Sequence, residues 1–210
     1  MKAKDRKKIE ARIEQRKKQI LDAATIVFSE KGYNRANTDE IAKKAGLGKG
    51  TLYRYFKNKK DIFFSVVDRG LDRLKENMLK EVENIQDPLK RIERAIRTLL
   101  SFFEENSDLV GMLIHEQSSF QKRIARRYFE HYYGKVERIK RTFKEAIAQG
   151  LIKNIDIETA ISVLTSMLNG LIYMWQFEGR KYSLKDKAPV IIKIFFTGII
   201  KDEKRRKKYE

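Results

Sequence analysis

The feature that most constrains this chain is the segment 38–56, whose residues are spaced as two short helices joined by a tight turn. Thr38 can cap the first helix, and Asp39 and Glu40 follow in its first turn, where the positive end of the helix dipole favours acidic side chains. Gly46 can adopt the left-handed conformation that ends a helix in a sharp turn. The segment therefore predicts a helix-turn-helix unit.

The second helix of this unit has one face for the core and one for solvent. Leu52 and Phe56 are four residues apart, so both point inward. The other side chains face outward, as a helix that enters the DNA major groove requires. We expect the DNA contacts to come from Thr38, Lys49, Gly50, Thr51, Tyr53, Arg54, Tyr55, Lys57 and Lys59. A helical hairpin without any DNA role would show the same spacing, so the flanking residues matter.

The flanks narrow the interpretation. Upstream, apolar residues from Ile20 to Phe28 recur at helical spacing, and downstream Asn58 and Asp61 resemble a capping box. This order of features resembles the DNA-binding domain of the tetracycline-repressor (TetR) family of bacterial transcription regulators. The resemblance is carried by Ile20-Leu21-Asp22-Ala23-Ala24, Phe28, Gly32-Tyr33, Thr38, Ile41-Ala42, Ala45-Gly46-Leu47, Lys49-Gly50-Thr51-Leu52-Tyr53, Tyr55-Phe56 and Asn58-Lys59. Gly48 stands where the family often has serine, so a hydroxyl contact to phosphate is lost there.

Charge points to the same partner. Residues 1–60 contain 18 Lys and Arg against 7 Asp and Glu, whereas residues 61–210 contain 29 against 22. A domain this basic attracts a polyanion and gains affinity by releasing its counterions. An anionic membrane surface would also attract it, but would not require the turn glycines and core spacing of the segment 38–56. We therefore expect duplex DNA as the partner.

Residues 1–18 are the most basic stretch, with nine Lys and Arg against three acidic residues. Two interpretations stay open for it. The stretch is either an arm that reaches adjacent phosphates or the minor groove, or a solvated extension of the first helix.

Beyond residue 60 every apolar pattern is helical, and no window shows the alternation of a strand. Asp87 followed by Pro88 is a typical helix start. We predict an all-α chain of about nine helices, with a helix-turn-helix DNA-binding domain over residues 1–60. Residues 61–210 are predicted to form an effector-binding and dimerisation domain.

One uncharged stretch, from Thr159 to Phe177, is close to the ~20 apolar residues of a membrane-spanning helix. It contains several polar residues, however, and Glu158 and Glu178 flank it without basic anchors. We expect a helix buried nearly all round inside protein, and no membrane partner.

The last two predicted helices are too apolar to be surface helices. Pairing residues 160–175 and 190–200 with their copies across a two-fold axis would build a four-helix bundle. Other helices of the same chain could cover them instead. The resemblance implies that this pair forms a homodimer interface, for which we expect Ser166, Gly170, Ile191, Ile194 and Phe195. A dimer presents two recognition helices and so favours a palindromic operator, with half-sites about 34–36 Å apart.

The resemblance also implies an effector pocket between the helices of residues 60–178. The aromatic and apolar side chains of that region suit a hydrophobic or amphipathic small molecule. Our candidates are Ile96, Phe103, Met112, His115, Tyr133, Asn169 and Tyr173. Each of them could equally be core packing.

Several function classes are disfavoured. The chain has no cysteine, and His115 and His131 lack the spacing of a helical metal pair. No nucleophile elbow, P-loop or dinucleotide motif is present, so we expect no enzyme, no catalytic residue, no metal and no cofactor. The charged N-terminal stretch lacks an apolar segment, which predicts a cytoplasmic protein. Three hypotheses remain: a ligand-responsive homodimeric regulator, by family tendency a repressor, then a ligand-free architectural DNA-binding protein, and last a membrane-associated basic protein.

Overall fold

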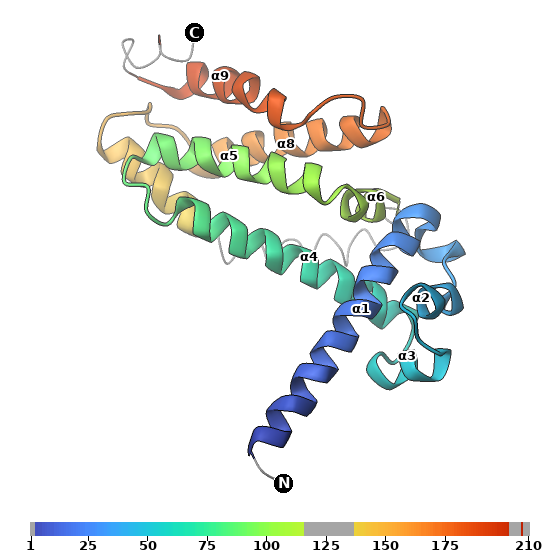
Figure 1. Cartoon of the computed structure of the whole chain (residues 1–210). Helices are drawn as coiled ribbons and strands as arrows, with labels where there is room; N and C mark the ends of the chain where they lie inside the picture. The colour runs from blue at the N-terminus through green and yellow to red at the C-terminus, as the bar shows by residue number, and fades with distance from the viewer. Residues whose placement is uncertain (1–2, 116–136, 202–206, 208–210) are drawn as a thin grey trace. The chain divides into compact units, whose positions relative to one another are not determined.

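The computed structural model describes residues 3–115, 137–201 and 207, and these are mostly helical (Figure 1). An isolated bridge between Ile152 and Ile200 is the β-type pairing found there. The predicted all-α fold is therefore confirmed in the described residues.

The chain forms two compact units. The first contains Met1–Gly70 and Asp108–Ile124, and the second contains Leu71–Ser107 and Ala125–Glu210. Two helices, α4 (Lys59–Val82) and α6 (Ser107–His115), each run from one unit into the other. The predicted boundary after residue 60 stays a prediction.

The first unit is built on α1 (Ala3–Arg35), α2 (Thr38–Lys44), α3 (Lys49–Tyr55) and the first half of α4. Gly32 interrupts α1 with a φ of 69°. The core between these helices consists of fully buried apolar side chains, and ring contacts join Phe28, Tyr33 and Phe63. Those at 0% exposure are Ile20, Ala24, Phe28, Ile41, Leu52, Ile62, Phe63 and Val67.

The second unit contains the rest of α4, α5 (Pro88–Glu105), helical residues 137–148, α8 (Ile157–Phe177) and α9 (Ala188–Ile199). Asp87 and Asp156 cap α5 and α8, because their carboxylates accept hydrogen bonds from backbone N–H groups of the first turn. A short 3₁₀ turn at Lys185–Lys187 precedes α9, whose first turn contains Pro189. In Figure 1, α8 and α9 lie beside α5, with which both are in contact.

The single chain does not bury α8 all round, contrary to the expectation from its sequence. Its buried side chains form one stripe, and the opposite face is open in the single chain. The buried stripe consists of Ile161, Leu164, Leu168, Ile172 and Trp175. By length and composition alone, α8 is also the one helix in the described residues that could span a membrane.

Candidate nucleic-acid interface and effector cavity

The turn between α2 and α3 is closed by backbone hydrogen bonds. Gly46 has a φ of 66°, and its N–H donates to the carbonyl of Lys43 while Leu47 N–H donates to that of Ala42. A residue with a side chain rarely adopts this φ, which explains why a glycine stands here. This turn places α3 directly after α2, as a helix-turn-helix unit requires.

The cap of α2 is Asn37, one residue before the predicted Thr38. Asn37 has extended backbone angles, and its Oδ1 accepts a hydrogen bond of 2.9 Å from Asp39 N–H. Thr38 is the first helical residue and is 7% exposed. Its hydroxyl lies 3.0 Å from the hydroxyl of Tyr53. Thr38 therefore positions Tyr53 on α3.

The open face of α3 carries mostly the side chains expected from the sequence. Leu52 is fully buried, while Tyr53 is 41% exposed. Lys49, Gly50 and Arg54 are exposed as well. Thr51 and Tyr55 are half-buried, and Lys57 after the helix end is exposed. This face offers hydrogen-bond donors and positive charge to a groove.

Two lysines differ in their freedom to contact DNA. The Lys49 Nζ lies 2.9 Å from a carboxylate oxygen of Asp39, and the hydrogen bond and charge of that carboxylate raise the pKa of Lys49. Both side chains are more than half exposed, so a phosphate can replace the carboxylate. Lys59 is half-buried and donates to the carbonyls of Asn34 and Ala36, at 3.3 and 3.0 Å. Lys59 therefore caps the end of α1 with two of its three ammonium donors, and its contact with phosphate stays a prediction.

Gly48, at the cap of α3, makes no side-chain capping hydrogen bond. A Cβ atom there would meet no other atom within 4 Å, so a larger residue would fit. The absence of the hydroxyl at this position thus has no steric cause within the protein.

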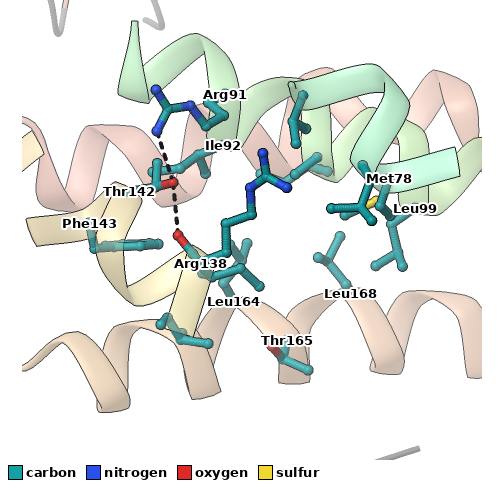
Figure 2. A pocket seen from close by; sticks show the side chains of 16 residues that line it. Met78, Arg91, Ile92, Leu99, Arg138, Thr142, Phe143, Leu164, Thr165 and Leu168 are labelled. Carbon is teal, nitrogen blue, oxygen red and sulfur yellow. Dashed lines mark hydrogen bonds between the residues drawn. The ribbon is translucent and has the colours of Figure 1, made fainter. Parts of the chain in front are cut away.

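The second unit contains a cavity of about 110 Å³, as bounded by the described residues (Figure 2). It lies between α4, α5, α8 and the helical residues 137–148. Most of the lining is aliphatic. The lining residues are Met78, Leu79, Val82, Arg91, Ile92, Ala95, Ile96, Leu99, Arg138, Ile139, Thr142, Phe143, Ile161, Leu164, Thr165 and Leu168.

Two arginines border this cavity. Arg91 is already engaged, since its guanidinium lies 2.7 Å from Glu145 and also donates to Thr142 and to the carbonyls of Ile85 and Gln86. Arg138 reaches in among the lining side chains in Figure 2. Within the described part of the chain the guanidinium of Arg138 forms no ion pair, which leaves its charge available.

The exposed faces of α8 and α9 are unusually apolar. Val163, Tyr173, Met174 and Phe177 of α8 are 42–75% exposed, and so are Val190 and Ile194 of α9, at 53 and 55%. Large exposed apolar faces of this kind mark interaction sites.

Comparison with known proteins agrees with this geometry. The family model described as "Bacterial regulatory proteins, tetR family" matches residues 20–66. The family model described as "Tetracyclin repressor-like, C-terminal domain" matches residues 85–199. The second match alone covers more than half of the chain. The chain belongs to the TetR family.

Relatives of this TetR-family chain cover most of its length. The "Fatty acid metabolism regulator protein" of Bacillus subtilis (strain 168) is 27% identical over 184 residues, which are 86% of this chain and 94% of the relative. The solved structure of FadR from Bacillus subtilis in complex with stearoyl-CoA has a TM-score of 0.75 at 24% identity, and covers 86% of this chain and 97% of that one. A regulator from Saccharomonospora viridis in complex with choline has a TM-score of 0.79 at 19% identity, covering 90% and 100%.

These matches establish a DNA-binding transcriptional regulator and confirm the prediction that the chain is not an enzyme. They also show that the fold is shared by proteins crystallised with very different ligands. Among the described residues no group of three or more His, Cys, Asp or Glu side chains is placed to hold a metal.

The residues predicted for the effector pocket are not brought together. Ile96 lines the cavity. Phe103 is buried against Phe102, and Met112 is fully buried on α6 in the first unit. Tyr133 and the side chain of His115 lie outside the described residues.

Asn169 and Tyr173 lie on the exposed face of α8, away from its buried stripe. Together with Ser166 and Gly170 they are spaced i, i+3, i+4 and i+7, so all four share one side of the helix. Asn169 and Tyr173 therefore belong to the exposed face of α8 and do not line the cavity.

The residues predicted for the dimer interface also divide. Ser166, Gly170 and Ile194 are exposed and Ile191 is half-buried. Phe195 is only 5% exposed and packs its ring 6.2 Å from that of Phe143. Phe195 therefore belongs to the core of its own chain, because α9 turns this side inward.

Proposed function

We propose that this chain is a homodimeric repressor that leaves a palindromic operator when a long-chain acyl ligand, such as an acyl-CoA, binds in the second unit. The observation that carries the proposal is the aliphatic cavity between α4, α5, α8 and residues 137–148. The names of the relatives support the ligand class, since one regulates fatty acid metabolism and another was crystallised with stearoyl-CoA. Its place of action would be the cytoplasm, where the operator is.

The size and lining of the cavity suit part of an alkyl chain better than a whole drug-sized molecule. Its volume is below the roughly 300–1,000 Å³ of pockets for drug-sized ligands, and near the ~150 Å³ of an apolar cavity that holds benzene. Each methylene that enters such a site contributes about 0.8 kcal/mol. Arg138 would supply a positive charge for an anionic group at the end of the chain.

The same volume supports the second candidate function, a ligand-free architectural DNA-binding protein. If the cavity were only a packing defect, acyl compounds would not bind. Binding of stearoyl-CoA therefore separates the two candidates.

The dimer is supported by the apolar faces of α8 and α9 that the single chain leaves open. Tyr173 and Phe177 stack on this face with ring centroids 6.4 Å apart, and Gly170 permits a close helix approach. Two copies of α8 and α9 would cover each other in a four-helix bundle.

Coupling between ligand and DNA needs an element that both can bias. Met78, Leu79 and Val82 of α4 line the cavity, and the same helix begins at Lys59, four residues after α3 ends. A ligand that changes the packing of α4 thus acts on a helix continuous with the DNA-binding unit.

A cavity-filling substitution tests the ligand site. Ala95→Phe adds bulk to the lining, so binding of stearoyl-CoA should weaken at least about tenfold, a change of roughly 1.4 kcal/mol. Affinity for DNA should stay the same. The measurement is thermal shift and calorimetry with stearoyl-CoA, using CoA alone as the ligand without a tail.

Ala148→Phe is the matched control, since Ala148 is exposed on the same unit and does not line the cavity. Equal binding of stearoyl-CoA by both variants and the wild type would contradict this site.

Substitutions on α3 test the DNA contacts. Lys49→Ala should weaken all duplexes to a similar degree, because a phosphate contact carries no sequence information. Thr51→Ala and Tyr55→Ala should also change sequence preference, by about 1–3 kcal/mol at a contacted base pair. Binding would be measured to duplexes selected from random DNA by the wild-type protein.

The control for Lys49→Ala is Lys75→Ala, which removes an exposed lysine from the second unit. Lys59→Ala is unsuitable because its loss would uncap α1. If the Lys49 and Lys75 variants bound DNA alike, α3 would not contact the duplex through Lys49.

A further inference from the structure

The N-terminal half of α1 carries basic side chains that the helix-turn-helix unit does not use. α1 begins at Ala3 (Figure 1), and residues 5–15 are all exposed. The match to the family description begins only at residue 20. This half of α1, here called the basic arm (residues 3–19), therefore lies outside the residues that the family description matches.

Three basic residues of the arm form one row. Lys8, Arg12 and Arg16 follow each other at intervals of four residues, so they lie along one side of the helix at a rise of about 6 Å each. Among the described residues none of the three forms an ion pair, whereas Lys17 on another side pairs with Glu14. Like charges four residues apart destabilise an isolated helix, and an anionic partner would reverse this effect.

The row lies on the side of α1 that carries the helix-turn-helix unit. Arg12 and Glu30 are 18 residues apart, which is about five full turns, so both point to the same side. The Glu30 carboxylate lies 3.9 Å from Lys44 Nζ at the end of α2. The row therefore lies on the same side of α1 as Glu30, whose side chain reaches the end of α2.

We propose that Lys8, Arg12 and Arg16 bind phosphates of the operator duplex and form a second DNA contact outside the helix-turn-helix unit. A DNA strand carries one phosphate per ~3.4 Å of axis, so side chains ~6 Å apart can each meet a different phosphate. Because the arm and the helix-turn-helix unit share α1, docking of α3 holds the row at high local concentration near the duplex.

A membrane surface fits the arm less well. Ile9 and Ile13, at 49 and 38% exposure, are the large apolar side chains that the described arm leaves open. A helix that lies in a membrane interface instead buries a whole apolar face.

The test compares two triple variants of the full chain. Lys8→Gln, Arg12→Gln and Arg16→Gln remove the row, while Arg6→Gln, Lys7→Gln and Lys17→Gln remove three positive charges from other sides of the same helix. Both variants should keep the thermal stability of the wild type, since all six residues lie at or near the surface of the arm. The probe is the duplex selected from random DNA by the wild-type protein, titrated at several salt concentrations.

Log K falls with log salt, and loss of the row should make this slope shallower by about 0.9 per lost contact. For a dimer with three contacts per chain the change is about 5. The control variant should change the slope far less. Equal slopes for the two variants would overturn the proposal, because net charge alone would then act at long range. Binding to phosphatidylserine vesicles that the row variant loses, with its DNA slope unchanged, would overturn it in favour of a membrane.

The contact rests on duplex binding by α2 and α3. A wild-type protein that bound no duplex would remove both the repressor function and the arm contact. A normal wild type with an unchanged slope in the row variant would remove the arm contact alone.

Discussion

Replacing Ile194 with glutamate is expected to give a folded monomer that no longer binds its operator. Ile194 is 55% exposed on α9, so the single chain tolerates a charge there. In the proposed bundle the carboxylate would be buried without a partner, which costs several kcal/mol per ion. The dimer dissociation constant should rise at least about 100-fold, since each 1.4 kcal/mol is a factor of ten.

Sedimentation and operator binding measure this result, and circular dichroism checks the fold. Ile194→Leu is the control, because it keeps an apolar side chain of the same size and should leave the dimer intact. An Ile194→Glu protein that sedimented as the wild-type dimer would remove this face of α9 from the interface.

The neighbouring residue should respond in the opposite way. Phe195→Ala is expected to lower the free energy of unfolding by about 3–5 kcal/mol, because it leaves a cavity among packed aromatic rings. Phe195 is 5% exposed and contacts the rings of Phe143 and Phe196. The loss should appear in thermal and chemical denaturation of the isolated protein.

Ile192→Ala, at another buried position of α9, should behave similarly but with a smaller loss of about 2–5 kcal/mol. If the Phe195→Ala protein kept wild-type stability and only became monomeric, Phe195 would belong to the interface as the sequence first suggested.

The contrast between Ile194 and Phe195 shows why α9 could not be divided from its sequence. Both residues belong to an apolar run, and a helix that is apolar on every side has no polar stripe to mark which side faces its own core. The packing of Phe195 against Phe143 decides the question, and that contact joins residues 52 positions apart.

The helix-turn-helix unit was predictable because its signals are local. The φ of 66° at Gly46 and the full burial of Leu52 follow from residues within a short segment. The sequence does not distinguish Asn37 from Thr38 as the cap of α2, because the two are adjacent and both residue types cap helices well.

The lining of the cavity was predicted poorly. Asn169 and Tyr173 were chosen for their polar atoms, although their spacing from Gly170 already put them on the side of α8 opposite to Leu164 and Leu168. The i, i+4, i+7 pattern of Ile92, Ile96 and Leu99 was the signal that could have found the lining on α5. Arg138 carried no comparable signal, because an arginine that borders a cavity cannot be distinguished in sequence from an arginine on the surface of a helix.

The role of Lys59 could not be read from the sequence either. A lysine beside a recognition helix predicts a phosphate contact, yet its ammonium group is held by the carbonyls of Asn34 and Ala36 and lies 4.5 Å from the centre of the Tyr33 ring. These partners come from residues more than 20 positions earlier, at the end of α1.

The most direct test of ligand-responsive repression is the operator dissociation constant with and without saturating stearoyl-CoA. The ligand should raise this constant by about 5- to 150-fold, and by linkage saturating operator should raise the dissociation constant of stearoyl-CoA by the same factor. An operator affinity that stays unchanged while stearoyl-CoA is bound would contradict ligand control by this compound.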